Sequence, residues 1–226
     1  AKNLPNALSV LAVTLRDNLL HAPETYMEKI AIGPGLPKNL IDLDFDVNKN
    51  IELLSKAKNS SPDKLTACLL KRPRHEKIIK SLNSMGVKIN FINDGDVSGA
   101  ISVAYPNSKI DIYMGIGGGP EGVLAAAALR CLGGKIYGKL LFQTDTEKQR
   151  ASEMGINDFN KIYTTNDLAS GEVMFAATGV TDGTLLKGVR IKNNIATTHS
   201  VVMRSKTQTV RYVHASHNLY IKPIVS

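Results

Sequence analysis

The chain has 226 residues, a formal net charge of +8 and a hydrophobic content of 43%. This length suits one large α/β domain, or one domain with part of another, and the composition is that of a folded globular protein. No apolar run is long enough to span a bilayer, and nothing at the start reads as a signal peptide. We therefore expect a cytoplasmic protein with no membrane partner.

The positive charge does not by itself indicate nucleic-acid binding. Lys and Arg are spread along the chain, Trp is absent and aromatic residues make up only 5%. Single-strand binders combine a basic groove with stacking aromatic side chains, and this chain has neither pattern. We predict no nucleic-acid partner, because small phosphorylated metabolites account for the charge equally well. Cys68 and Cys131 lie in apolar segments without metal-ligand spacing, which predicts two buried, reduced thiols.

The first sixty residues predict short strands followed by one helix. Strands are expected at residues 7–15, 19–21 and 29–32, the last of them ended by a Gly-Pro-Gly breaker. An amphipathic helix follows, with Val47, Ile51, Leu54 and Ala57 on one face and Asp44 or Asp46 as its N-cap. The polar, turn-rich segment 59–64 then predicts a domain boundary, which divides the chain into residues 1–60 and 61–226.

Beyond this boundary the pattern alternates between strands and helices. Strands are predicted at residues 65–70, 87–92, 110–114, 135–142 and 173–177. Helices are predicted at residues 75–85, 97–104 and 121–132, and a capping box at Thr144 and Glu147 opens another that runs to residue 154. Such alternation favours an α/β fold with a mostly parallel sheet flanked by helices. Segments 195–203 and 207–213 predict a C-terminal β-hairpin.

Polar residues follow four of the predicted strands. In an open parallel sheet, ligands bind beyond the carboxyl ends of the strands, so these residues predict one site at one sheet edge. The four loops supply, in chain order, Arg72 and Arg74; Asp94 and Asp96; Glu121; and Thr178, Thr181 and Asp182.

Each of these groups also has a purely structural interpretation. The two arginines suit phosphate, because a guanidinium binds two oxygens at once, but Arg-Pro-Arg is equally typical of a solvated helix start. The Asp94-Gly95-Asp96 segment indicates contacts to sugar hydroxyls or a metal, or else a simple turn and helix cap. The five histidines show no zinc-type spacing, and no nucleophile elbow supports Ser/His/Asp catalysis.

The glycine-rich segment 115–122, "GIGGGPEG", contains the spacing Gly117-x-Gly119-x-x-Gly122 of dinucleotide-binding loops. Pro120 and Glu121 make this segment a poor binding site for a pyrophosphate, because a carboxylate repels phosphate unless a cation lies between them. Glu121 is therefore a candidate ligand for Mg²⁺ or Mn²⁺. Alternatively, it is a first-turn helix residue stabilised by the helix dipole.

Several blocks resemble a known family: "INDGDVSGAI", "GIGGGPEGVLAAAALRCLGG", "FAATGVTDGTLLKGVR" and "THSVVMRSKTQTVR". They are similar to the class II fructose-1,6-bisphosphatases of the GlpX type, and the similarity runs from about residue 3 to residue 217. The resemblance implies a layered sugar-phosphatase fold like that of inositol monophosphatases. It also implies Mn²⁺- or Mg²⁺-dependent removal of the 1-phosphate of fructose 1,6-bisphosphate in gluconeogenesis. Related sugar phosphatases form dimers or tetramers, so a homo-oligomer is implied.

The resemblance also implies roles for particular residues. Glu121 matches a metal ligand, and Gly118 matches a substrate-contacting position. Tyr26, Arg72 and Arg74 match the residues that bind the substrate through the phosphate that is not cleaved. The segment that contacts sugar hydroxyls is matched by Asp94, Gly95 and Asp96.

The family has further motifs that this chain does not contain. They are a metal-binding Asp-Pro-x-Glu-Gly-Thr segment, other metal carboxylates, a substrate-binding lysine and the threonine that aligns the attacking water, which would fall before Ala1. We therefore expect residues 1–60 to be the remainder of a metal-binding phosphatase domain and residues 61–226 to be a substrate-binding α/β domain. We expect no catalytic residue in this chain and no turnover by the chain alone.

Two other functions remain open at this point. The first is a sedoheptulose-1,7-bisphosphatase or an enzyme with both activities, since the family includes both. The second is a nucleotide- or metabolite-binding domain that uses the glycine-rich segment without a metal.

Overall fold

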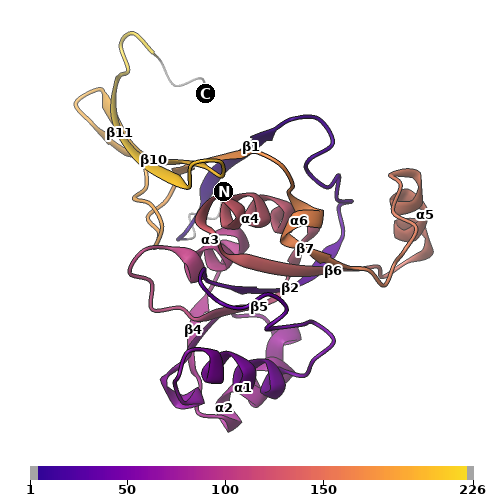
Figure 1. Cartoon of the computed structure of the whole chain (residues 1–226). Helices are drawn as coiled ribbons and strands as arrows, with labels where there is room; N and C mark the ends of the chain where they lie inside the picture. Colours follow the sequence, from indigo (N-terminus) through magenta and orange to yellow (C-terminus); the bar gives the residue numbers. More distant parts are fainter. Residues whose placement is uncertain (1–4, 223–226) are drawn as a thin grey trace.

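The computed structural model describes residues 5–222 and contains two β-sheets (Figure 1). The first is antiparallel, in the order β1-β8-β10-β11, with β9 paired to β10. Its strands are β1 (Leu8–Thr14), β8 (Val173–Gly179), β9 (Arg190–Lys192), β10 (Ile195–Arg204) and β11 (Thr209–Asn218). β10 and β11 pair over ten residues each, in the part of the chain where the sequence predicts a hairpin.

The second sheet is mixed and has the order β4-β3-β5-β2-β6-β7. Its strands are β2 (Tyr26–Ile32), β3 (Thr66–Leu70), β4 (Lys88–Ile92), β5 (Ile112–Gly118), β6 (Lys135–Leu141) and β7 (Ile162–Thr164). β3 is parallel to β4 and β5, whereas β2 is antiparallel to both β5 and β6, and β6 is antiparallel to β7. The prediction of a mostly parallel sheet is therefore wrong. Strand–helix alternation orients β3, β4, β5 and β6 alike, but β2 from earlier in the chain inserts between β5 and β6.

The helices form two layers on either side of the mixed sheet (Figure 1). Between the two sheets lie α3 (Asp96–Ile101), α4 (Gly119–Leu132) and α6 (Thr165–Leu168). On the other face of the mixed sheet lie α1 (Val47–Ala57) and α2 (Glu76–Ser84), which pack against each other. Helix α5 (Asp145–Glu153) lies to the side of these layers.

Helix α4 is the centre of the larger core. It contacts strands of both sheets, so its small residues are buried on nearly all sides, as expected of a helix that is apolar all round. Ala126 and Leu129 are fully buried there. The helix ends at Gly133, whose φ of 77° is the left-handed conformation that glycine adopts at helix C-termini. A second core, which includes Ile51 and Leu82, fills the space between the mixed sheet and α1 and α2.

Two of the predicted helix starts, those of α1 and α5, are confirmed by their side-chain caps. Asp46 accepts a hydrogen bond from the backbone N–H of Lys49 at the start of α1, and Thr144 accepts one from Glu147 at the start of α5. The predicted helix at 97–104 is α3 followed by a short 3-10 turn, η3 (Ser102–Ala104). The predicted strand at 19–21 is wrong: it forms a single bridge from Leu19 to Ala169, because the opposing chain is helical up to Leu168.

The boundary predicted near residue 60 does not separate the strands of these sheets. β1 pairs with β8, and β2 lies between β5 and β6, so strands from before residue 60 belong to both sheets. Cys68 and Cys131 are free and buried, as predicted. In the described part of the chain, no helix combines the length and the apolar character required to cross a membrane.

Candidate functional site

Three of the four predicted loops meet at one edge of the mixed sheet. β3, β4 and β5 run parallel, so the segments that carry Arg74, Asp96 and Glu121 follow their carboxyl ends at the same side. A cavity of about 390 Å³ there is lined by Asp94, Asp96 and Glu121, among others. The structure therefore places these three loops at one edge of the sheet, as the sequence pattern predicted.

The fourth loop, which contains Asp182, follows β8 in the antiparallel sheet. The prediction that it shares the edge of the parallel strands is wrong, because the chain has crossed to the other sheet before β8 begins. Asp182 forms an ion pair with Arg190, the first residue of β9. Asn6 links this loop to the site: its Oδ1 accepts a hydrogen bond from the Thr184 N–H at 2.9 Å, and it also lines the 390 Å³ cavity.

The glycine-rich segment is the end of a strand joined directly to a helix. β5 extends to Gly118, beyond its predicted end at residue 114, and α4 begins at Gly119. A Cβ atom at Gly117 would lie 2.3 Å from Asp96 Oδ2, and one at Gly118 would lie 1.9 Å from Glu121 Oε2. These two glycines therefore leave room for two carboxylate side chains that lie against the strand.

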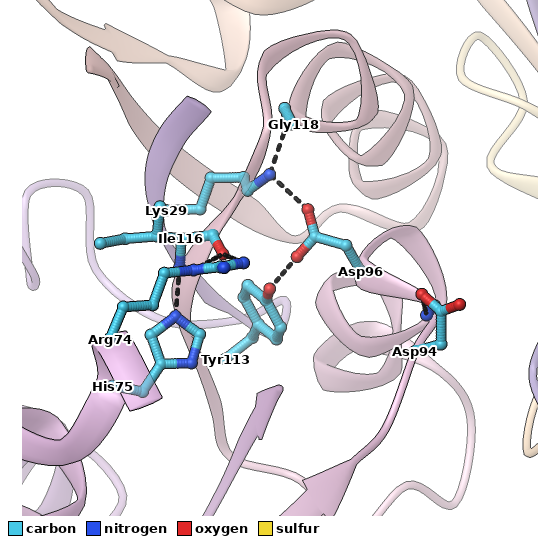
Figure 2. Close-up of polar contacts among 9 residues, drawn as sticks. Lys29, Arg74, His75, Asp94, Asp96, Tyr113, Ile116 and Gly118 are labelled. Atoms are coloured by element: carbon cyan, nitrogen blue, oxygen red, sulfur yellow. Dashed lines mark hydrogen bonds and ion pairs between the residues drawn. The ribbon is translucent and has the colours of Figure 1, made fainter. Parts of the chain in front are cut away.

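Asp96 is held by two buried donors (Figure 2). The Lys29 ammonium, on a side chain that is fully buried in β2, donates to Asp96 Oδ2, and the Tyr113 hydroxyl donates to Asp96 Oδ1. Burial, reinforced by the nearby Asp96 carboxylate, raises the pKa of Tyr113 well above its ordinary value, so this phenol stays protonated as a donor. Asp96 is thus part of a buried network as well as a residue that lines the cavity.

Lys29 and Tyr113 were not predicted as site residues from the sequence. Lys29 also donates to the carbonyl of Gly118, with an Nζ–O distance of 2.8 Å. The available signal was weak: Lys29 directly precedes the apolar run Ile30, Ala31 and Ile32, but it follows the charged Glu28. A lysine is fully buried only when it has partners, and those partners come from β5 and α3, which are distant in sequence.

Arg74 and Tyr26, which the resemblance assigns to substrate binding, lie together. The Arg74 guanidinium is 5.0 Å from the centre of the Tyr26 ring, within the range of a cation–π contact. Its Nε and Nη2 donate to the Ile116 carbonyl at 3.1 and 2.7 Å. Tyr26 is paired across the sheet with Gly118, so three predicted substrate-binding residues share this corner. Arg72 instead donates to the carbonyl of Lys71.

His75 fixes the position of the turn that carries Arg74. This turn, η2 (Pro73–His75), packs against β5. His75 Nε2 accepts from the Ile116 N–H at 2.9 Å, so Nδ1 carries the proton and donates to the Leu70 carbonyl at 2.7 Å. Burial lowers the pKa of His75, which keeps the ring neutral as this arrangement requires. The sequence interpretation missed this residue because it considered only metal spacing and catalytic triads.

Glu121 lies between two cavities. One is the 390 Å³ cavity, and the other, of about 420 Å³, is lined by Glu24, Tyr26, Gly118 and Glu147 as well as Glu121. Within residues 5–222, no group of three or more His, Cys, Asp or Glu side chains is arranged to hold a metal ion. Glu121 is exposed, and the carboxylates around it in the described residues do not by themselves form a complete metal site.

Comparison with known proteins shows the family to which the chain belongs. The chain belongs to the family of bacterial fructose-1,6-bisphosphatases encoded by glpX, which it matches over residues 1–217. It is 39% identical over 224 residues to a protein of Trichodesmium erythraeum, and 39% identical over 226 residues to one of Trichormus variabilis. Both are named D-fructose 1,6-bisphosphatase class 2/sedoheptulose 1,7-bisphosphatase. The matches cover 93% and 94% of this chain but only 65% of each relative.

Proposed function

We propose that the protein takes part in the metal-dependent hydrolysis of fructose 1,6-bisphosphate to fructose 6-phosphate and inorganic phosphate. Membership of the glpX-type family and the names of the relatives support this proposal. The structural observation that carries it is the convergence of Arg74, Tyr26, Gly118 and Glu121 at one corner of the mixed sheet. We propose further that the layers described above correspond to the fold of the inositol monophosphatase-like sugar phosphatases.

The substrate-binding part of the proposal is assigned to residues of this chain. Arg74 is exposed and already oriented by the Ile116 carbonyl and the Tyr26 ring, so it offers its remaining N–H donors to the phosphate that is not cleaved. Arg72 lies two residues away and adds positive charge. Asp94, exposed beside the 390 Å³ cavity, is proposed to accept hydrogen bonds from sugar hydroxyls. Binding at the far phosphate orients the reacting end of the substrate.

The metal-binding part of the proposal assigns one ligand, Glu121, to Mn²⁺ or Mg²⁺. A divalent ion in such enzymes neutralises charge on the phosphoryl group and lowers the pKa of bound water. Because residues 5–222 contain no three-ligand cluster, we assign no catalytic step to this chain, and we expect the 226-residue chain alone to release no phosphate. The resemblance places the other metal ligands in motifs that precede the matching blocks.

Phosphate release by the full-length protein tests the proposal. We expect release from fructose 1,6-bisphosphate with Mn²⁺ or Mg²⁺ and none after chelation with EDTA. Arg74→Ala is expected to raise KM tens of fold, because losing a hydrogen-bonded charge contact costs about 2–5 kcal/mol. Arg204→Ala, which removes an exposed arginine on the antiparallel sheet, is the matched control. Absence of metal-dependent release would refute the function, and an unchanged KM would remove Arg74 from the site.

A second substrate is favoured by the names of the relatives, which include sedoheptulose 1,7-bisphosphatase. Parallel assays with both sugar bisphosphates distinguish one activity from two. Nucleotide binding by the glycine-rich segment has less support, because Gly117 and Gly118 accommodate Asp96 and Glu121. Stabilisation by adenine nucleotides without metal in a thermal-shift assay would reverse that judgement.

We also propose that the protein forms a homo-oligomer, either a dimer or a tetramer. The antiparallel sheet exposes large apolar side chains on β9, β10 and β11, and exposed apolar surface of this kind is what subunit interfaces bury. Tyr212 and Val213 are consecutive in β11, so the exposed side chains lie on both faces of the sheet. They include Ile191, Ile195, Tyr212 and Val213, each about half exposed. Light scattering coupled to size exclusion measures the mass directly, and a monomeric mass at micromolar concentration would contradict the proposal.

A further inference from the structure

We propose that Lys29 is a positioning residue. It fixes two turns of the candidate site relative to each other: the start of α4, which carries Glu121, and the start of α3, which carries Asp94 and Asp96. The inference rests on the function proposed above, but its central test does not depend on activity. The Lys29 ammonium bonds both to the Gly118 carbonyl and to the Asp96 carboxylate (Figure 2). One buried side chain of β2 therefore connects the end of β5 with the start of α3.

Each contact lies beside a residue of the proposed site. Gly118 is the N-cap of α4, so its carbonyl lies immediately before the first turn that carries Glu121. Asp96 is the first residue of α3 and follows Asp94 and Gly95 directly. A shift of either turn changes the distance between the proposed metal ligand and the proposed sugar-binding residues. Lys29 itself lines neither of the two cavities beside Glu121, so it sets this distance without contacting the space where a ligand would bind.

Stability alone does not account for a buried charge at this position. Taking an ammonium and a carboxylate out of water carries a large desolvation cost, and replacing such a pair with apolar residues is often neutral or stabilising. A methionine would fill a similar space in β2 but would hold neither the Gly118 carbonyl nor Asp96. What an apolar side chain cannot reproduce is the connection between the two turns.

Tyr113 provides a matched control within the same network. Its hydroxyl donates to Asp96 Oδ1, on the opposite side of the carboxylate from Lys29. Tyr113→Phe therefore weakens the hold on Asp96 but leaves the contact between Lys29 and Gly118 in place. If Lys29 positions the start of α4, loss of the lysine and loss of the hydroxyl have different effects on the segment from Ile116 to Gly122.

The first measurement is amide hydrogen exchange of residues 116–122 in the full-length protein without ligand. We expect at least tenfold faster exchange in Lys29→Met than in wild type, and no change there in Tyr113→Phe. Because Lys29→Met leaves Asp96 without its cation, Lys29→Met/Asp96→Asn is made in parallel and is expected to show the same acceleration. If residues 116–122 exchange at the wild-type rate in a folded Lys29→Met or Lys29→Met/Asp96→Asn protein, the proposal is overturned.

The second measurement separates positioning from a general loss of structure. Mn²⁺ affinity, measured by calorimetry, is expected to fall at least tenfold in Lys29→Met but not in Tyr113→Phe, although Lys29 itself offers no metal ligand. Equal Mn²⁺ affinities in wild type and Lys29→Met would count against the proposal. A wild-type protein that releases no phosphate would refute the proposed function, while the exchange result would still decide the role of Lys29.

Discussion

Replacing Gly117 with alanine tests whether Asp96 is locked in place behind the glycine-rich strand. The new Cβ would lie 2.3 Å from Asp96 Oδ2 and 2.6 Å from its Cγ, far closer than two such atoms approach in folded proteins. Gly117 does not have a positive φ, so alanine causes no backbone strain there. The cost of Gly117→Ala therefore measures how firmly Asp96 is held.

The size of that cost follows from the partners of Asp96. Its carboxylate cannot move away without leaving Lys29, whose side chain is fully buried, and Tyr113. Depriving a buried charge of its partner costs about 3–5 kcal/mol. For a protein of this size, roughly 2–4 °C of melting temperature corresponds to 1 kcal/mol, so we expect Gly117→Ala to lower Tm by about 6–20 °C.

Gly118→Ala is the matched comparison. Its new Cβ would overlap a carboxylate even more closely than that of Gly117→Ala, but the side chain it meets is free to move. Its Cβ would meet Glu121 Oε2 at 1.9 Å, yet Glu121 is exposed and can rotate into solvent. We expect this variant to lose less than about 1 kcal/mol of unfolding free energy, as is usual for exposed positions. Urea unfolding of both variants gives the two values under the same conditions.

The order of the two costs is the decisive outcome. If the free energy of unfolding of Gly117→Ala lies within about 1 kcal/mol of the wild-type value, Asp96 moves freely and the buried network does not hold it. If Gly118→Ala is the more damaging of the two, Glu121 is held more tightly than its exposure indicates. Either result would refute the description of the site given above.

Three further predictions concern single groups. Burial holds the pKa of His75 below its ordinary value of 6.5, so at mildly acidic pH the folded protein keeps the ring neutral while the unfolded chain takes up a proton. The free energy of unfolding is therefore expected to fall as the pH drops below about 6.5, and to fall less steeply in His75→Gln. Urea unfolding of both proteins at pH 8, 6.5 and 5 measures this. Glu121→Gln is expected to weaken Mn²⁺ binding at least tenfold in calorimetry while leaving the urea midpoint unchanged, and equal affinity would exclude Glu121 as a ligand. Burial raises the pKa of Cys68 and Cys131 to about 11, so thiol reagents at pH 8 are expected to label them only after unfolding, and rapid labelling of the native protein would contradict this.

The features that the sequence predicted well are those set by local chemistry. The caps Asp46 and Thr144 and the terminating Gly133 act within one helical turn, so the starts of α1 and α5 and the end of α4 could be identified within a residue or two. The polar edge was also predictable, because β3, β4 and β5 are parallel neighbours and their carboxyl ends coincide. That part of the prediction required no knowledge of the rest of the sheet.

The features that could not be predicted depend on pairings between distant segments. Nothing local to Tyr26–Ile32 indicates that β2 inserts antiparallel between β5 and β6, which begin only at Ile112 and Lys135. The same insertion brings Lys29 beside Gly118 and Asp96, so missing the topology also meant missing the lysine. β8 was placed in the wrong sheet for a related reason: it follows helices along the chain as β4 and β5 do, and its sheet is decided by its pairing with β1 and β10.

The fingerprint spacing Gly117-x-Gly119-x-x-Gly122 has a physical explanation that involves no dinucleotide. A Cβ at Gly117 would meet Asp96, one at Gly119 would lie 3.1 Å from the Pro23 carbonyl, and one at Gly122 would lie 2.5 Å from the sulfur of Met27. Two of these neighbours precede or belong to β2, and the third comes from α3, so each glycine allows close approach by another element of the fold. The spacing is what a strand and helix need when both pack tightly against β2. A Cβ at Gly122 would also lie 3.3 Å from Cδ of Lys29. This predicts that Gly122→Ala first destabilises the fold, by crowding Met27 and Lys29, whereas a dinucleotide loop would lose ligand binding first.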